Sequence, residues 1–96
     1  MIILAIDTSG PVAGVSVWCD GAIRYEAAAV NKMTHSENIM PMVEEALLRA
    51  GVTKEQLTLL AVTVGPGSFT GVRIGVTAVK ALSHALGIPC VAVDAL

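Results

Sequence analysis

The sequence predicts a single α/β domain with a mixed β-sheet, and three observations support this. The first thirty residues alternate between apolar and polar side chains around Asp20-Gly21, a pattern typical of antiparallel strands joined by a tight turn. Two stretches with helical spacing then alternate with short apolar runs, as in parallel crossover units. A chain of 96 residues has room for one core. We therefore expect the order β-β-β-α-β-α-β.

The first three elements are expected to form a meander of strands. Residues 2–6 are a continuous apolar run that ends at Asp7, which indicates a strand buried on both faces. Residues 12–19 alternate in hydropathy, and residues 22–30 form the returning strand. Asp20-Gly21 lies between them and favours a two-residue hairpin turn.

A first helix is expected to begin at Thr34 and to end at Gly51. Thr34 and Glu37 have the spacing of a capping box, and Gly51 can adopt the positive φ that ends a helix. Pro41 lacks an N–H, so we expect a kink or a frayed first turn around it. Apolar residues recur along one face of this helix: Ile39, Met40, Val43, Ala46, Leu47 and Ala50.

The rest of the chain is expected to form a strand, a long helix and a last strand. Residues 58–64 are apolar and β-branched, which indicates a buried strand. A helix over residues 68–86 follows and ends at Gly87, and residues 90–93 form the final strand.

Composition and charge exclude several classes of protein. The chain is 54% hydrophobic and 15% charged with a net charge of −2, and its six basic residues are scattered, so it has no electrostatic footprint for nucleic acid. No run is long and apolar enough to span a membrane, and Asp7 comes too early for a signal peptide, so we expect a cytoplasmic protein. Cys19 and Cys90 lie in apolar runs without metal-type spacing and are expected to be reduced core thiols.

Two segments are candidates for anion or cation binding. Asp7, Thr8 and Ser9 follow the first strand, where an acid can hold a hydrated cation and hydroxyls can meet a phosphate. The sequence alone favours a simple Asx turn there over a binding site. Gly65, Gly67 and Ser68 precede the second helix, whose N-terminus favours an anion. They match neither the Walker loop nor the G-x-G-x-x-G spacing.

The second helix carries a face with small side chains. The residues Gly71, Gly75, Ala78 and Leu82 recur at steps of four, three and four, and such a face permits close approach of another backbone. Each glycine lowers helix stability by about 1 kcal/mol relative to alanine, so a packing contact should offset the loss. That contact is either a partner subunit or the domain's own sheet.

The residues assemble no complete catalytic set. His35 and His84 have no neighbouring metal ligands in sequence, and neither Ser9 nor Ser68 has the context of a nucleophile elbow.

Four segments together resemble one family. They read AIDTS at residue 5, THSENIMP at residue 34, VGPGSFTGVRIG at residue 64 and IPCVAVDAL at residue 88. All 96 residues resemble the N-terminal half of the bacterial TsaB (YeaZ) family. The resemblance implies one ribonuclease-H-like lobe of the actin-like ATPase fold, spanning 1–96, with the family's second domain absent from this chain.

The resemblance also implies a function in tRNA modification. Members act in forming N6-threonylcarbamoyladenosine in tRNA, where TsaB binds the transferase TsaD as a required non-catalytic partner together with the ATPase TsaE. The implied contact surface lies on the two helices and serves a heterodimer or a homodimer, with tRNA reached only through the complex. Carried over to this chain, it comprises Met40, Val43, Leu47, Gly71, Gly75, Ala78 and Leu82.

Catalysis is not expected, because the catalytic paralogue in this family has a metal-binding H-x-x-x-H just after the strand equivalent to residues 90–93. Here that place reads Val93-Asp94-Ala95-Leu96, so no metal site is expected. The family was once labelled a metalloprotease, but this sequence shows neither a set of zinc ligands nor a nucleophile that would support that activity. This domain alone is expected to bind no cofactor. ATP or ADP with magnesium is expected to bind only in the full complex. The alternatives are a catalytic or nucleotide-binding lobe of an actin-like transferase or kinase, and a separate anion-binding module.

Overall fold

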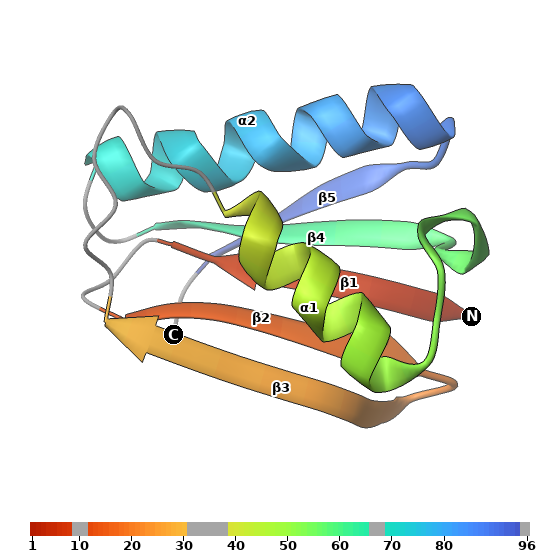
Figure 1. Ribbon diagram of the computed structural model, residues 1–96. Helices are drawn as coiled ribbons and strands as arrows, with labels where there is room; N and C mark the ends of the chain where they lie inside the picture. The colour runs from red at the N-terminus through yellow and green to blue at the C-terminus, as the bar shows by residue number, and fades with distance from the viewer. Residues whose placement is uncertain (9–11, 31–38, 66–68, 95–96) are drawn as a thin grey trace.

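The computed structural model describes residues 1–8, 12–30, 39–65 and 69–94, and it has two layers (Figure 1). One layer is a five-stranded sheet in the order β3-β2-β1-β4-β5, and the other holds two helices. The elements are β1 (Ile2–Asp7), β2 (Val12–Cys19), β3 (Ala22–Val30), α1 (Met40–Ala50), the 3-10 turn η1 (Lys54–Gln56), β4 (Leu59–Gly65), α2 (Phe69–Leu86) and β5 (Cys90–Asp94). The predicted fold class and element order are confirmed.

The sheet is mixed, with an antiparallel half and a parallel half. β1 pairs antiparallel with β2, and β2 pairs antiparallel with β3 through the predicted hairpin. Asp20 and Gly21 adopt φ values of 51° and 86° there, as a tight turn of this hand requires. β4 lies parallel to β1 and to β5, so the carboxyl ends of these three strands meet at one edge.

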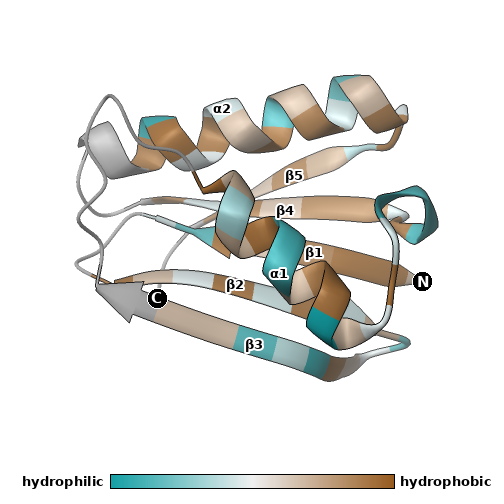
Figure 2. Ribbon diagram, in the orientation of Figure 1, coloured by the Kyte–Doolittle hydropathy of each residue, from teal (hydrophilic) through white to brown (hydrophobic). Residues whose placement is uncertain are grey.

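The core lies between the helices and one face of the sheet. Alternate residues of each strand point to this face, so cross-strand neighbours such as Leu4, Val17 and Leu60 are fully buried together. The helix α1 packs on β2 and β3, and α2 packs on β1, β4 and β5. The central strands are hydrophobic over much of their length (Figure 2). No helix in the described ranges is long and apolar enough to cross a membrane.

The start of α1 differs from the prediction. The helix begins at Met40 with Ile39 as its N-cap, and Pro41 lies in the first turn. Proline is well tolerated there because the N–H it lacks has no partner inside the helix, so no kink is required. Thr34 and Glu37, which suggested an earlier start, lie outside the described residues. The end is as predicted, with Gly51 at φ 73°.

The prediction that both cysteines lie in the core is wrong for Cys90. Both thiols are free, but Cys90 is exposed and Cys19 only half-buried. Cys90 begins β5, which is the last strand in the sheet order, so it has a neighbouring strand on one side only.

An ion pair joins Met1, at the start of the chain, to Asp20 in the turn of the hairpin. The amine of Met1 lies 2.8 Å from Asp20 Oδ1 and donates a hydrogen bond to it. This hydrogen bond, reinforced by the positive charge, lowers the pKa of Asp20 below its ordinary value. A lowered folded-state pKa contributes stability above the ordinary pKa, and that stability is lost as the pH falls through the folded value.

Acetylation of the Met1 amine is therefore expected to return the pKa of Asp20 toward its ordinary value. The reason is that acetylation removes the charge and weakens the donor. A titration followed by carboxyl NMR, run on the chain with and without the acetyl group, would measure it. An unchanged Asp20 titration after acetylation would show that the ion pair is absent in solution.

Candidate functional site

The two predicted binding segments meet at the carboxyl edge of the parallel strands. Asp7 ends β1 and Gly65 ends β4, and these strands are parallel neighbours with Ile6 opposite Val62. Asp94 at the end of β5 lies opposite Gly65 in the register. The carboxyl ends of parallel strands are where such sheets commonly present ligand-binding groups. Three of the predicted site residues, Ser9, Gly67 and Ser68, lie outside the described residues.

The side chains of Asp7 and Thr8 point to opposite faces of the sheet. Thr8 is completely buried, and its Oγ1 would lie 2.5 Å from a Cβ placed on Gly75 of α2. Asp7 is half-buried and lines a hollow on the sheet. The prediction grouped the two side chains toward one ligand, but the Thr8 hydroxyl lies beneath α2 and is not available at the surface.

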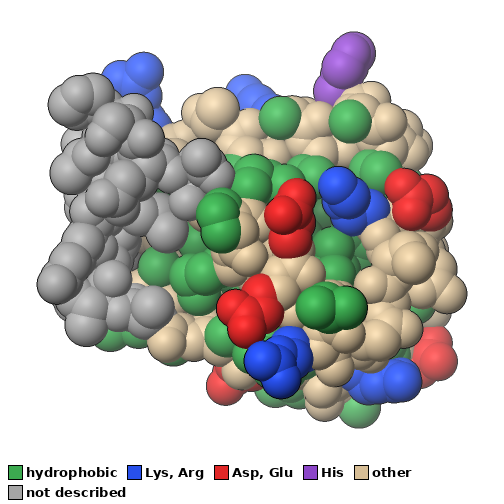
Figure 3. Space-filling view, viewed as in Figure 1, with side chains coloured by type: hydrophobic (Ala, Val, Ile, Leu, Met, Phe, Trp, Pro, Cys, Tyr) green, Lys and Arg blue, Asp and Glu red, His purple; other side chains and the backbone are tan. Residues whose placement is uncertain are grey.

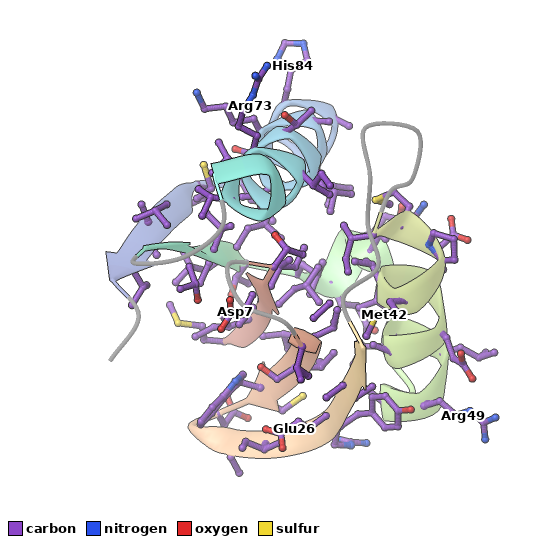
Figure 4. The ribbon with its side chains drawn as sticks, turned by 90° about the vertical axis from the view of Figure 1, so that its left-hand side faces the viewer. Asp7, Glu26, Met42, Arg49, Arg73 and His84 are labelled. Atoms are coloured by element: carbon purple, nitrogen blue, oxygen red, sulfur yellow. The ribbon has the colours of Figure 1, made fainter. Side chains whose placement is uncertain are left out.

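The hollow beside Asp7 has a volume of about 350 Å³ and is open to solvent on one side. Its polar side chains come from four strands and include Asp7, Ser16, Glu26 and Thr63. Figure 4 shows Asp7 and Glu26 on the side of the sheet opposite α1. The carboxylates can accept hydrogen bonds and attract a cation. The described residues contain no group of three His, Cys, Asp or Glu that could hold a metal ion.

Four of the predicted interface residues belong to this chain's own core. Val43, Leu47 and Leu82 are 0%, 4% and 7% exposed, and Gly75 is buried against Thr8, Val62 and Ile6. The small-residue face of α2 therefore packs on the domain's own sheet at Gly75, which corrects its assignment to a partner contact. Close packing of helix on sheet is the physical reason for the glycine.

The other predicted interface residues are less enclosed. Met40 and Ala78 are half-buried against the core. Gly71 lies in the first turn of α2, but its surroundings are not among those described.

The outer surface of the helix layer carries one large apolar side chain that the prediction missed. Leu48 is 78% exposed on α1 and lies off the buried stripe of Val43, Ala46, Leu47 and Ala50. The signal was available, since the second leucine of Leu47-Leu48 breaks the helical spacing. Acidic and basic side chains lie around apolar ones over α1 (Figure 3). Arg49 extends from α1 away from the sheet, as do Arg73 and His84 from α2 (Figure 4).

The fold resembles that of RuvC at low sequence identity. RuvC from Thermus thermophilus matches with a TM-score of 0.62 and 18% identity, covering 98% of this chain and 64% of RuvC. Because the identity is low, this likeness concerns the fold alone. The sheet order and the two helices on one face thus define a ribonuclease-H-like domain.

Closer comparisons identify the family. A family model for TsaD, the tRNA N6-adenosine threonylcarbamoyltransferase, matches residues 28–96. The tRNA threonylcarbamoyladenosine biosynthesis protein TsaB of Bacillus subtilis is 41% identical over 96 residues, covering 100% of this chain and 42% of that protein. The structure of YeaZ from Pseudomonas aeruginosa matches with a TM-score of 0.88 and 35% identity, over 98% of this chain and 45% of YeaZ. The chain belongs to the TsaB (YeaZ) family and spans less than half the length of these two relatives.

Proposed function

We propose that this chain is a non-catalytic subunit in the formation of N6-threonylcarbamoyladenosine in tRNA, and that it binds a TsaD-like transferase. The names of its TsaB relatives support the pathway. The transferase is bound through the outer faces of α1 and α2, and in isolation the same faces pair two copies. A TsaE-like ATPase joins this complex in the cytoplasm. The chain contacts tRNA only as part of the complex.

The exposed Leu48 is the observation that carries the binding role. It lies beside Glu45 and Arg49, whose side chains form an ion pair of 3.5 Å along the helix. An exposed aliphatic side chain bordered by charged groups is the composition of an interface, where apolar contacts give affinity and the polar rim gives specificity. Met40 and Met42 on the same helix are half-buried and pack against the core, so Leu48 is the large apolar side chain that α1 exposes.

The non-catalytic role rests on the chemistry at the carboxyl edge of the sheet. Among the side chains that the structure describes, Asp7 is the acid at the end of a strand on this edge. The hydroxyl of the neighbouring Thr8 is buried. The hollow offers two carboxylates, Asp7 and Glu26, and we regard this as a poor set for holding the metal with which a transferase would polarise its donor. The resemblance to the catalytic paralogue points the same way, since Val93-Asp94 stands where that paralogue has a histidine.

A nucleotide-binding lobe is the second candidate. It is favoured by the meeting of Asp7 with Gly65 at one edge and by the match to the transferase model over residues 28–96. In that case ATP or ADP with magnesium would bind, and calorimetry with each nucleotide distinguishes the two candidates. Heat released when a nucleotide binds the isolated chain would favour the nucleotide-binding lobe. We propose instead that a nucleotide binds only in the full complex.

Leu48→Asp is expected to weaken binding to the transferase of the same organism by at least about tenfold, because it places a charge in an apolar contact. Mass measurement of the mixed proteins by light scattering, followed by titration, would test this. Val93→Asp is the matched control, since Val93 is 49% exposed on β5 in the sheet layer. Equal binding by wild type and Leu48→Asp would refute the proposed contact surface, and no complex with wild type would refute the function.

A further inference from the structure

The exposed side of α2 carries basic side chains and no acidic ones. Arg73, Thr77, Lys80 and His84 are exposed and recur at steps of four, three and four, so they line one side of the helix. Figure 4 shows Arg73 and His84 extending away from the sheet. With a rise of about 1.5 Å per residue, this line is roughly 16 Å long. We call these four residues the cationic ridge.

The charge of α2 is opposite in sign to that of the whole chain. The chain has eight Asp and Glu residues and six Lys and Arg residues, yet α2 holds two of the basic residues and none of the acidic ones. The helix α1 differs, since it has both signs and its Glu45 pairs with Arg49 at 3.5 Å. The positions three and four residues away from Lys80 hold no acid, so its charge has no partner on its own helix.

The stability of α2 does not explain this pattern. The amino-terminal end of a helix favours acidic side chains and the carboxyl-terminal end favours basic ones, and the effect is confined to the end turns. The first turn of α2 has no acid, and of the three basic side chains only His84 lies in the last turn. Arg73 also interacts within the chain, so the argument depends on Lys80, whose charge serves no contact within α2.

The composition of the cationic ridge favours a protein partner over RNA. RNA would be held through its phosphates, and two Lys and Arg side chains release too few counterions for tight binding. An acidic protein surface needs only carboxylates placed opposite the ridge. The exposed residues beside the basic ones, Ala81 and Ala85, are small, so a flat partner surface can reach the Lys80 ammonium group. The ridge therefore fits a protein with an acidic surface.

We propose that the cationic ridge docks on an acidic surface of the TsaD-like transferase, where Lys80 faces a carboxylate. This inference rests on the proposed function, because it names the chemistry of the surface that α2 meets. The two helices lie in one layer (Figure 1), so the ridge steers the encounter while Leu48 on α1 supplies the apolar contact. A second copy of this chain fits less well, since two ridges repel each other and Glu45 is already paired with Arg49.

Lys80→Glu tests the cationic ridge through the kinetics of association. At low salt this variant is expected to associate with the transferase of the same organism about tenfold more slowly than wild type, because the charge that steers the encounter is reversed. The difference should shrink as salt is added, since screening weakens both attraction and repulsion. Lys80→Arg keeps the charge and should associate at close to the wild-type rate. Surface plasmon resonance with immobilised transferase measures all three rates.

Lys54→Glu is the matched control. It makes the same change of charge in the turn η1, outside both helices, and should alter the association rate by less than about twofold. Lys80 is exposed, so its substitutions should leave the fold intact. Circular dichroism of each variant confirms that it is folded.

Several outcomes would overturn the inference. Equal association rates for wild type and Lys80→Glu at low salt would refute the cationic ridge and leave the proposed function standing, because the complex still forms. Equal slowing by Lys54→Glu would show that only the net charge of the chain matters. Weaker tRNA binding by the assembled complex, with an unchanged rate of association with the transferase, would identify RNA as the partner of the ridge. If the wild-type chain forms no complex, the ridge and the proposed function both fail.

Discussion

Gly75→Ala is expected to lower the free energy of unfolding by about 1–2 kcal/mol, although alanine is the better helix former. The added Cβ would lie 2.5 Å from Thr8 Oγ1 and 3.2 Å from Val62 Cγ2. Both neighbours are buried in the centre of the domain, so α2 has to move away from β1 and β4. Leucine at the same position is expected to prevent folding. Urea unfolding followed by circular dichroism measures both variants.

Two further variants isolate the cause of this loss. In Thr8→Ala the nearest atom is removed, so the cost of Gly75→Ala should be smaller in that background than in wild type, with the contact to Val62 remaining. Gly14→Ala is the matched glycine control, because its Cβ would have only one neighbour, Ala27 O at 3.9 Å, and should cause little change. A Gly75→Ala chain that is more stable than wild type would show that α2 does not pack closely here.

The fold followed from patterns that depend on neighbouring residues. Strand alternation, the Asp20-Gly21 turn and the glycines that end both helices are local signals, and each predicted its element. The helix starts were harder, because capping-box spacing occurs in more than one place. At Thr53 and Gln56 the box caps η1, with Thr53 N donating to Gln56 Oε1 at 2.8 Å, and no helix was predicted there.

The candidate site was predicted less well because its side chains are sorted by layer. Sequence reasoning placed Asp7 and Thr8 together at a strand end, and that position is correct. Which of them faces solvent depends on where α2 lies, and its approach to β1 at Gly75 is a tertiary contact. The same limit applies to helical spacing, which finds an apolar face but does not distinguish a core contact from a subunit contact. Val43 and Leu47 were predicted to contact a partner subunit, but they are buried in the core of this chain.

Leu47→Ala and Leu48→Ala test that distinction with the same chemical change at adjacent positions of α1. Leu47 is 4% exposed and Leu48 is 78% exposed. Removing the Leu47 side chain leaves a cavity between α1 and the sheet, so we expect a loss of about 3 kcal/mol in the free energy of unfolding. Leu48→Ala removes atoms that already contact water and should change it by less than about 0.5 kcal/mol.

Denaturant unfolding of the two variants at low protein concentration would measure the difference, and the concentration matters. If two copies pair through the helix layer, Leu48 becomes buried as the concentration rises, and the cost of Leu48→Ala should then increase while that of Leu47→Ala stays large. Equal costs for the two variants at low concentration would mean that α1 packs with a different face on the sheet. A large cost for Leu47→Ala alone would establish that its contact is with this chain's own core, leaving Leu48 as the leucine that is available to a partner.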